Sequence, residues 1–571
     1  MSKARLIEAA GGRRPVDLLI TDARVVNVFS GEIIEGHVGV FEGYIAGIGD
    51  YEAVETMSAG GGYVTPGFID AHTHIESSMV SISELGKILV PRGITTLVAD
   101  PHEIANVLGA EGISYMLSAA ENQPMNVFFM LPSCVPATDK ETAGAVLDAG
   151  SLEPFMSHDR VLGLGEMMNF PGVIGADPGV LEKIRAAKDR GMPVDGHAPG
   201  LSGKELAAYA AAGIGSDHEC VSEEEAMEKL RAGMHIMIRE STGAKNLGAL
   251  LPAVNERTAG RMMWCTDDRH PNDILEQGHL DFIMKQAVRA GLNPVTAVRM
   301  GTINPAEYFG LSELGAIAPG RRADFVVMKD LERFQPREVY CAGRLAARDG
   351  EAMPEHFQGG AGAECPRSMN VREGELNLRI RASGRAIRVI EVIPGQIITK
   401  MRVEPARVAQ GEAISDVERD ILKLVVVERH KASGNVGLGF VSGFGLKSGA
   451  LAGSVAHDSH NIIAVGVSDS DILSAVQEVI RMEGGLAVVS DQKAVAYLPL
   501  PIAGLMSELP LREVAEKTGE LNRAAARLGS KLADPFMTLS FLALPVIPEL
   551  RLTDQGLFEA SRFEHVSLFM D

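Results

Sequence analysis

The amino-acid sequence predicts an α/β fold: a (β/α)8 barrel, a small β-sandwich domain built from both of its flanks, and a C-terminal α+β domain. Its 571 residues correspond to roughly three or four structural units at about 150 residues each. Eight short apolar runs that end in polar residues recur through the middle of the chain, and most are followed by helix-like sequence. Strand-rich segments with glycines at turn spacing lie on either side of that region.

The β-sandwich domain is expected to combine residues 1–65 with residues 308–365. Residues 16–65 carry β-branched residues punctuated by glycines, which is the pattern of a small antiparallel sheet. A similar pattern returns at residues 314–350. Two strand-rich pieces that flank a different middle predict one small β domain closed by both ends of an insertion.

The barrel is expected over residues 66–307. Its eight strand-like runs are GFIDAHTH (67–74), ITTLVADPHE (94–103), NVFFMLPSC (126–134), VLGLGE (161–166), MPVDGH (192–197), GIGSDH (213–218), HIMIRES (235–241) and MMWCTDD (262–268). Eight strand–helix repeats over roughly 250 residues are typical of a parallel (β/α)8 barrel. In such a barrel the polar residues at the C-terminal ends of the strands converge on one mouth, where barrel enzymes place their active sites.

A C-terminal α+β domain is expected over residues 366–571. The segments LNLRIRA, AIRVIEVIP, ILKLVVVERH and LAVVS have the character of strands, whereas DILSAVQEVIRM and LREVAEKTGELNRAAARLG space their apolar residues as helices do. Residues 354–368 are rich in glycine and proline, and we expect them to form the linker that leads into this domain.

The composition excludes several classes of function. The chain has 54 lysines and arginines against 75 aspartates and glutamates, and the resulting net charge of −21 repels phosphate backbones and anionic membrane surfaces, so neither nucleic acid nor a membrane is an expected partner. No secretory signal and no stretch of about 20 apolar residues is recognisable. Five scattered cysteines without CxxC spacing predict reduced thiols, so we expect a cytoplasmic protein.

Six polar residues at the predicted strand ends form a candidate metal site. His72 and His74 close the first run, and on a strand residues i and i+2 point to the same side, so both imidazoles can share a metal ion. Four further residues each end a separate run, the fourth, fifth, sixth and eighth: Glu166, His197, His218 and Asp267. Four histidines and two carboxylates at one mouth suit first-row divalent ions. The alternative is that all six are ordinary polar side chains with structural partners.

Several segments resemble the amidohydrolase superfamily and, within it, the bacterial adenine deaminase family. PGFIDAHTHIE (66–76) is similar to the first-strand motif of the superfamily, and SELGAIAPGRRADFVVM (312–328) to part of its β-sandwich. The segments that narrow the resemblance are DPHEIANVLG (100–109), GLGEMMN (163–169), CTDDRHP (265–271) and AHDSHNIIAVG (456–466). The resemblance covers nearly the whole chain. It implies purine salvage by a metal-activated hydroxide that converts adenine, a small purine substrate, to hypoxanthine and ammonia.

The resemblance also implies a binuclear metal centre. Many binuclear members bridge their ions with a carboxylated lysine on the fourth strand, where this chain has Glu166, whose two oxygens can bridge without modification. His72 and His74 would hold one ion, His197 and His218 the other, and Asp267 would also be a ligand. Two divalent ions are expected, Mn(II) or Fe(II) by resemblance, with Zn also compatible. The glutamate argues against hydantoinase-type and dihydroorotase-type relatives, in which the lysine is usual.

The resemblance assigns catalytic roles to residues near the second and eighth runs. Asp267 would take the proton from the attacking hydroxide and pass it to the leaving amine. Its neighbour Asp268 could exchange roles with it, but adjacent strand residues face opposite sides, so only one of the two should point at the metals. A purine nitrogen must also be protonated. Glu103 is the candidate acid, and the alternative is that His102 and Glu103 form a pair that orients the ligands.

Candidate substrate-binding residues come from both ends of the chain. Arg239 and Ser241 end the seventh run, Arg269 and His270 follow the eighth, and all four could contact the purine edge, although arginines at such a mouth are equally common as salt-bridge partners. The AHDSHN segment is expected to act as a lid or pocket loop that reaches the barrel mouth of its own or a neighbouring subunit, rather than as a second metal site. Its polar residues are His457, Asp458 and His460.

Two other functions are compatible with parts of this pattern. Another amidohydrolase that acts on a cyclic amide or a related purine or pyrimidine ring would use the same barrel, and substrate tests separate the two. A non-catalytic scaffold on the same fold is opposed by the intact set of six candidate ligands. A homodimer is expected by analogy with the superfamily.

Overall fold

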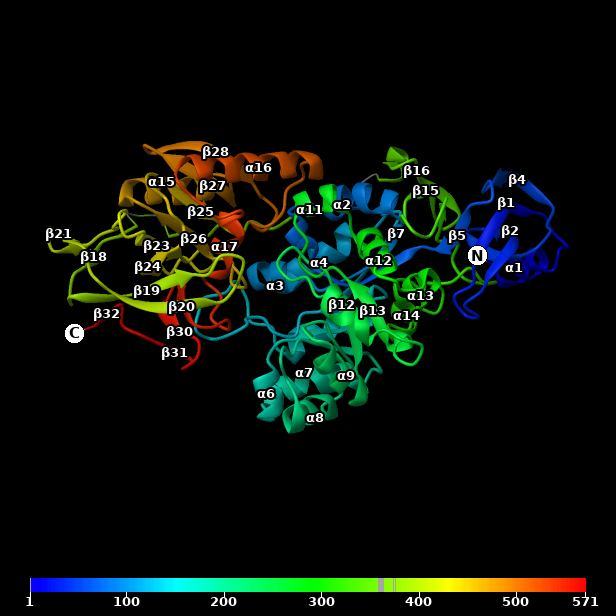
Figure 1. Ribbon diagram of the computed structural model, residues 1–571, viewed down its shortest axis with the longest axis horizontal. Helices are drawn as coiled ribbons and strands as arrows, with labels where there is room; N and C mark the ends of the chain where they lie inside the picture. Colours follow the sequence, from blue (N-terminus) through cyan, green and yellow to red (C-terminus); the bar gives the residue numbers. More distant parts are fainter. Residues whose placement is uncertain (1, 358–363, 373, 375, 571) are drawn as a thin grey trace.

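The computed structural model describes residues 2–357, 364–372, 374 and 376–570, and it has three parts arranged along its long axis (Figure 1). The barrel lies in the middle, the sheet that contains the first strands lies at one end, and the C-terminal strands and helices lie at the other. The predicted fold class is confirmed. The domain boundaries drawn from the sequence stay predictions.

Eight parallel strands form the barrel. Five of them make one sheet and three make another: β6 (Phe68–Thr73), β7 (Ile94–Ala99), β8 (Asn126–Leu131), β9 (Val161–Met167) and β10 (Val194–Gly196), then β11 (Ser216–Asp217), β12 (His235–Arg239) and β13 (Met262–Cys265). The amide of Gly215 donates to the Val194 carbonyl (2.8 Å), and the amide of Asp267 donates to the His72 carbonyl (2.9 Å). These bonds join the two sheets at both seams. Seven of the eight strands fall within their predicted runs, and β9 extends one residue beyond its run, to Met167.

The barrel strands are apolar on both faces, as parallel strands between a core and a layer of helices must be. Inside the barrel, side chains from different strands pack into one cluster that includes Val98, Met130, Met237 and Met263. This packing fills the barrel axis below the mouth. The polar side chains of the candidate site therefore gather where the strands end.

Helices and short helical turns cover the outside of the barrel and connect its strands. Ser81 caps the first of them by accepting a hydrogen bond from the Glu84 amide (3.4 Å), and Asp177 caps α7 in the same way. The helices are α2 (Ile82–Leu89), α3 (His102–Leu108), α4 (Ala110–Ala119), α5 (Ala149–Leu152), α6 (Phe170–Ile174), α7 (Pro178–Lys188), α8 (Gly203–Ala211), α9 (Glu223–Arg231), α10 (Leu247–Leu250), α11 (Pro271–Glu276), α12 (Leu280–Arg289), α13 (Pro294–Met300) and α14 (Ile303–Tyr308).

Both flanks of the barrel contribute strands to one nine-stranded sheet. After α1 (Lys3–Ala10) come β1 (Val16–Val26), β2 (Ile33–Phe41), β3 (Tyr44–Ile48), β4 (Ala53–Ser58) and β5 (Tyr63–Pro66), and beyond the barrel come β14 (Phe325–Met328), β15 (Pro336–Cys341), β16 (Arg344–Arg348) and β17 (Glu351–Ala352). The antiparallel pairing of β5 with β14 joins the two flanks.

The expectation of a purely antiparallel sheet is wrong for the first flank. Strand β1 pairs antiparallel with β2 but parallel with both β4 and β5. Turn glycines mark where strands end, and they carry no information about the direction in which distant strands pair.

The C-terminal part is built on a second nine-stranded sheet. Its strands are β19 (Ala386–Val392), β20 (Thr399–Pro405), β23 (Leu422–Val427), β24 (Val436–Ser442), β25 (Ala450–Gly453), β26 (Ile462–Gly466), β27 (Gly485–Ser490), β28 (Lys493–Pro499) and β32 (Phe569–Met570). The three helices are α15 (Asp469–Arg481), α16 (Leu511–Arg527) and α17 (Pro535–Phe541). Shorter strands complete this part: β18 (Ile380–Arg381), β21 (Val408–Ala409), β22 (Glu412–Ala413), β29 (Leu550–Thr553), β30 (Gly556–Glu559) and β31 (Glu564–His565).

One detail differs from the sequence-based expectation for this part. The predicted strand LNLRIRA shrinks to the two residues of β18. Of the expected linker at 354–368, residues 358–363 lie outside the described residues.

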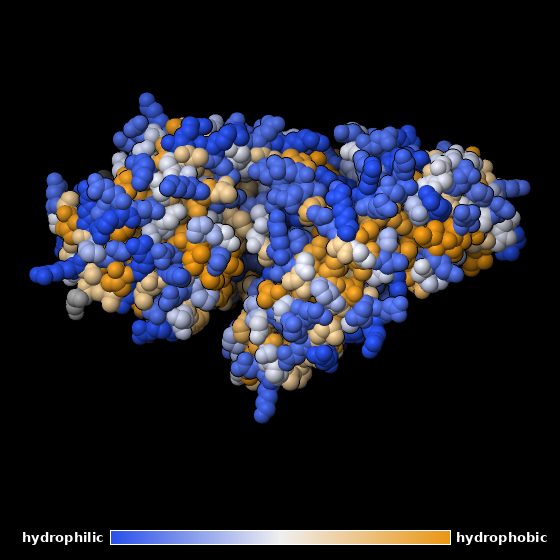
Figure 2. All heavy atoms as spheres, viewed as in Figure 1, coloured by the Kyte–Doolittle hydropathy of each residue, from blue (hydrophilic) through white to orange (hydrophobic). Residues whose placement is uncertain are grey.

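Figure 2 shows polar side chains over most of this face, with apolar patches on the barrel and the first sheet and a hollow between the barrel and the C-terminal part. All five cysteines are free thiols. In the described part of the chain, no helix combines the length and the apolar character needed to cross a bilayer.

Candidate active site and metal centre

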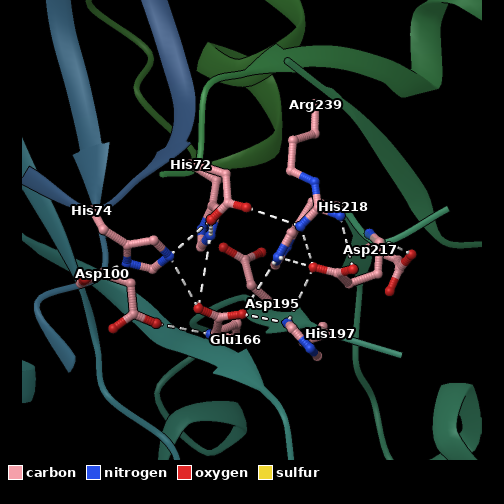
Figure 3. Close-up of polar contacts among 12 residues, drawn as sticks. His72, His74, Asp100, Glu166, Asp195, His197, Asp217, His218 and Arg239 are labelled. Atoms are coloured by element: carbon pink, nitrogen blue, oxygen red, sulfur yellow. Dashed lines mark hydrogen bonds and ion pairs between the residues drawn. The ribbon is translucent and has the colours of Figure 1, made fainter. Parts of the chain in front are cut away.

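The six predicted ligands meet at the mouth of the barrel. Figure 3 labels five of them: His72, His74, Glu166, His197 and His218. His72 and Glu166 project from β6 and β9. His74, His197 and His218 follow directly after the ends of β6, β10 and β11, and Asp267 lies two residues beyond the end of β13. Five of the six are buried and His197 is half-buried. Their ligating atoms group into three sets of three, each set within 4.8 Å: His72–His74–Glu166, Glu166–His197–His218 and His72–His218–Asp267.

The Glu166 carboxylate lies between two pairs of histidines. Its Oε1 atom is 3.2 Å from His74 Nε2 and 3.8 Å from His72 Nε2. Its Oε2 atom is 2.6 Å from His197 Nδ1 and 3.3 Å from His218 Nε2. One oxygen therefore faces each pair, which is the arrangement that a carboxylate bridge between two metal ions requires.

The imidazole tautomers fit metal ligation. His74 Nδ1 is 3.0 Å from the carbonyl of Asp100, so Nδ1 carries the hydrogen and donates it, and Nε2 is left with its lone pair facing the cluster. His72 Nε2 is buried and has no hydrogen-bond partner among the described residues. An orphaned nitrogen in this position is costly unless something binds it, and a divalent ion would satisfy it.

Asp267 is held against the first histidine pair. Its Oδ1 atom is 3.0 Å from His74 Nε2 and 3.6 Å from His72 Nε2, and its Oδ2 atom accepts a hydrogen bond from Arg239 Nη1 (2.8 Å). The backbone of Asp267 has a φ of +56°, in the left-handed region that non-glycine residues rarely adopt. Such conformations cluster at functional sites, where surrounding contacts hold them in place.

The prediction that only one of the two neighbouring aspartates faces the site is wrong. An oxygen of Asp268 lies within 4.8 Å of ligating atoms of both His74 and Asp267. The alternation rule fails here because β13 ends at Cys265 and the left-handed residue Asp267 turns the chain. Asp268 also accepts a hydrogen bond from the Ser77 hydroxyl.

Hydrogen bonds and charge pairing keep both carboxylates of the cluster ionised in spite of their burial. Burial would raise the pKa of Glu166, but hydrogen bonds from His197 and His218 hold that pKa well below its usual range. Burial opposes ionisation of Asp267 too, and the positive charge of Arg239 outweighs it, so its pKa is also well below normal. Two negative charges are thus available to a cation at the mouth.

The four candidate purine-binding residues at the seventh and eighth runs are Arg239, Ser241, Arg269 and His270. Of these, only His270 lines the cavity between the barrel mouth and the C-terminal part. Arg269 is buried and donates from Nε to the Gly278 carbonyl and from Nη1 to the Glu240 carbonyl, both at 2.8 Å. Ser241 closes its own turn through Ala244. The guanidinium of Arg239 donates hydrogen bonds to Asp267, Glu219 and Asn246. The contacts of Arg269 and Ser241 therefore hold loops of the barrel together. The contacts of Arg239 direct its side chain toward the candidate metal ligands.

The C-terminal loop predicted to reach the barrel mouth does so in its own chain. Glu103, at the start of α3, accepts hydrogen bonds from His457 Nδ1 (2.7 Å) and from His460 Nε2. His102 connects this pair of contacts to the ligand cluster, because its Nε2 is 3.6 Å from Glu103 and its Nδ1 is 3.4 Å from Glu166. Asp458 is buried beside them, and its Oδ2 has no hydrogen-bond partner among the described residues.

A cavity of about 970 Å³ lies between the barrel mouth and the C-terminal part. The barrel contributes Met79, Thr242 and His270 to its wall, and the C-terminal part contributes His457 and Phe541. His457 therefore touches the cavity on one side and Glu103 on the other. The volume is at the upper end of what small-molecule sites occupy, about 300–1,000 Å³.

Two residues of the site were missed by reasoning from the sequence. Glu219 accepts from Arg239 Nη2 (2.9 Å) and lies 3.3 Å from His218 Nε2 and 3.5 Å from His197 Nδ1. Its position directly after a predicted ligand was the available signal. Asp100 accepts from the Glu166 amide (3.0 Å) and, through its carbonyl, orients a ligand histidine. Its position in the second run, directly after the apolar residues that form β7, was the same kind of signal.

Comparison with known proteins agrees with this geometry. The Amidohydrolase family matches residues 63–346, and the Adenine deaminase C-terminal domain matches residues 396–564. "Adenine deaminase" of Desulfatibacillum aliphaticivorans is 52% identical over 99% of each chain, and "Adenine deaminase 2" of Carboxydothermus hydrogenoformans is 51% identical over 98% of each. "Adenine deaminase" of Methanothrix thermoacetophila is 50% identical over 99% of each. Because this identity extends through both the barrel and the C-terminal part, the chain belongs to the adenine deaminase family of the amidohydrolases.

Proposed function

We propose that this protein hydrolyses adenine to hypoxanthine and ammonia. The observation that carries the proposal is the Glu166 carboxylate, which offers one oxygen to each of two histidine pairs at a barrel mouth beside a ligand-sized cavity. The relatives named adenine deaminase share about half of their residues with this chain along its whole length, which supports the choice of substrate.

The donor set suits two divalent ions. His72, His74 and Asp267 would hold one, His197 and His218 the other, with Glu166 shared. When bound, the ions would lower the pKa of water from 15.7 to about 7 and so supply hydroxide at neutral pH. Nitrogen and carboxylate donors are compatible with Mn(II), Fe(II) and Zn, and we propose Mn(II) or Fe(II) as the natural occupants.

Asp267 is the proposed proton carrier between the attacking oxygen and the leaving amine. Three observations support this role: the carboxylate faces the histidines, it is ionised, and Arg239 fixes its second oxygen. Asp268 lies close enough to take part, which supports the exchange of roles considered from the sequence. A hydrogen-bonded arginine orients the carboxylate and keeps it ionised until the substrate reacts.

The remaining expectations concern the setting of the enzyme. The net charge of −21 supports the proposal that nucleic acid is not a partner. Five free thiols support the proposed cytoplasmic location, because reducing compartments keep cysteines unpaired. A homodimer stays a proposal drawn from the resemblance to the superfamily.

The test is ammonia release from adenine by chelator-stripped protein, before and after Mn(II) or Fe(II) is added back. We expect activity only with metal, together with stoichiometric formation of hypoxanthine. Protein that binds two ions yet leaves adenine unchanged would overturn the choice of substrate and favour the cyclic-amide alternative. Full activity in stripped protein with no residual metal would overturn the metal-dependent mechanism.

A further inference from the structure

The C-terminal loop at residues 455–461 reaches the edge of the barrel mouth. It leaves β25, approaches α3 and returns to β26. Two of its histidines contact Glu103, which is separated from His460 by 357 positions in the sequence. A contact between such distant segments brings a side chain of the C-terminal part to the edge of the barrel mouth.

This loop is rigidly held. Two neighbouring buried residues donate to its backbone: Arg429 to the carbonyl of His460, and His430 Nε2 to the carbonyl of Ser459 (2.6 Å). Asn461 donates to the Thr142 carbonyl of the barrel (2.9 Å). Groups held this firmly keep their geometry before a ligand arrives, which is what a catalytic side chain needs.

The hydrogen-bond partners of His460 show that its contact with Glu103 is not a metal site. Its Nδ1 accepts from the amide of Ala456 (3.1 Å), so Nδ1 carries no hydrogen in the neutral ring, and Nε2 must carry it. An Nε2 that carries a hydrogen donates to the Glu103 carboxylate and cannot bind a metal. His460 therefore anchors Glu103.

His457 differs from His460 because its ring reaches the cavity. Nδ1 donates to Glu103 (2.7 Å), and the ring stacks on Phe541 with a centroid distance of 4.6 Å and an interplanar angle of 18°. The polar contact of the ring within the described residues is made through Nδ1, and the residue lines the 970 Å³ cavity. A buried carboxylate thus orients an imidazole whose other nitrogen is free for a ligand.

We propose that His457 is a catalytic residue, the proton donor to a purine ring nitrogen, and that Glu103 is the positioning carboxylate that orients it. This inference rests on the proposed adenine deamination. It changes the role expected for Glu103 from the sequence: the carboxylate holds the acid and does not act as the acid itself. It also explains why the C-terminal part belongs to the enzyme, because that part supplies the donor.

The charges around His457 and Glu103 support their assignment as proton donor and positioning carboxylate. Burial lowers the pKa of His457, but Glu103, Asp268 and Asp458 outweigh burial and raise the pKa to about 9. Burial would raise the pKa of Glu103, yet the surrounding histidines hold it well below normal. The proton therefore resides on the imidazole at neutral pH.

Other titratable groups near His457 lie on its own loop and in the wall of the cavity, which also includes Lys245, Asp273, Glu276 and Lys531. His460 lies beside it on the same loop, with ring centroids 5.6 Å apart. Helix α17 packs against it with Phe541 and has no titratable side chain. Across the cavity wall, His270 is paired with Asp534 (3.7 Å). Carboxylates thus dominate the surroundings of His457.

The proposed step balances in protons and electrons. As the oxygen of hydroxide forms its bond to C6, the electron pair of the C6–N1 double bond moves onto N1, which takes the proton from His457 Nε2. The bond between C6 and the exocyclic amine then breaks, and the hydrogen of the added hydroxyl leaves on ammonia. His457 regains from solvent the proton that water released when it became hydroxide.

The primary test compares His457→Gln with His565→Gln, the same change at an exposed histidine of the C-terminal part. We expect His457→Gln to keep its metal content and to lose about 10²–10⁴-fold in kcat, the usual contribution of general acid catalysis, while KM changes little. The wild-type fall in kcat at high pH should also disappear from the residual activity. His565→Gln should match the wild type.

Glu103→Gln supplies a second readout that a loss of folding cannot imitate. Removal of the adjacent negative charge should move the high-pH fall of kcat to lower pH by about 1–3 units, because an unpaired imidazolium loses its proton more easily. If Glu103 were the acid itself, this variant would lose activity at every pH without such a shift.

The inference is overturned if His457→Gln retains kcat within tenfold of the wild type, or if the high-pH limb persists in its residual activity. If His457→Gln loses its metal, its low kcat does not test the role of the imidazole. The pH profile of Glu103→Gln is then the measurement that tests the inference. Wild-type protein that releases no ammonia from adenine would contradict the proposed function instead, so the two failures are distinguishable.

Discussion

Two glutamates at the barrel mouth are surrounded by histidines, yet the two clusters are built for different tasks. Glu166 lies among His74, His72, His197 and His218, and Glu103 lies between His457 and His460. In each cluster, imidazole nitrogens stand within hydrogen-bonding or coordination distance of a buried carboxylate. Residue type alone does not tell the two clusters apart.

The difference lies at the far nitrogen of each ring. His74 Nδ1 donates to a carbonyl, which leaves Nε2 as an electron-pair donor suited to a metal. His460 Nδ1 accepts from an amide, which leaves Nε2 as a hydrogen donor suited to a carboxylate. In these two rings, the backbone group that hydrogen-bonds Nδ1 therefore determines the state of Nε2. Nε2 of His74 is left free for a cation, and Nε2 of His460 carries a hydrogen for the glutamate.

The largest expected effect comes from Glu166→Gln, which removes the shared negative charge but keeps the size of the side chain. We expect the protein to lose bound metal and essentially all adenine deaminase activity, because an amide is a poor bridge between two cations and leaves four histidines without their carboxylate. Metal content by inductively coupled plasma mass spectrometry and ammonia release measure both effects.

Glu103→Gln is the matched control, since it makes the same chemical change in the neighbouring cluster. It should retain the metal content of the wild type. Equal loss of metal from both variants would contradict the distinction between the two clusters.

A smaller effect is expected from Arg239→Met, which removes the guanidinium that holds Asp267 and Glu219. Loss of such an orienting partner typically costs about 10–100-fold in activity or metal affinity. We expect the loss in kcat with little change in the KM for adenine, because the arginine contacts carboxylates and not the cavity. A rise in KM at unchanged kcat would instead indicate that Arg239 binds the purine.

The sequence was sufficient to predict the barrel and the convergence of the six candidate ligands because both follow from local patterns. An apolar run that ends in a polar residue indicates both a buried parallel strand and the end of that strand that faces the active site. The run that ends in His218 therefore places this side chain at the mouth, even though β11 has only two residues. The i, i+2 spacing of His72 and His74 works in the same way.

The remaining features depend on contacts between distant segments, which single-sequence patterns do not contain. Arg269 follows the eighth run as a binding residue would, but its donors are taken by carbonyls of two loops that the fold brings around it. Glu103 and its hydrogen-bond partner His460 are 357 positions apart in the sequence. The inward turn of Asp268 depends on the left-handed backbone of its neighbour Asp267.

His460→Asn should separate stability from metal binding. Asparagine tolerates the left-handed backbone of this position, where φ is +55°, but its shorter side chain cannot replace the Nε2 contact with Glu103. A buried acceptor that loses its donor costs about 1–3 kcal/mol, so we expect the free energy of unfolding to fall by that amount in denaturant titration. Metal content should match the wild type. A variant that loses metal at full stability would assign His460 to the metal centre.

The smallest predicted effect concerns how the His457–Glu103 pair stabilises the protein as pH changes. The pKa of His457 is raised from an ordinary 6.5 to about 9, so the stability that its positive charge contributes is fully present below about pH 6.5 and is lost as pH rises through 9. The difference in Tm between the wild type and His457→Gln should therefore be largest near pH 6 and shrink toward pH 10.

Differential scanning calorimetry across that range tests this, with His565→Gln as the control. Effects of pH on the rest of the protein are common to wild type and variant and cancel in the difference. A difference in Tm that stays constant from pH 6 to pH 10 would mean that His457 does not titrate in this window. His457 would then not be a proton donor with a pKa of about 9, and Glu103 would return as the candidate acid that its position in the sequence suggested.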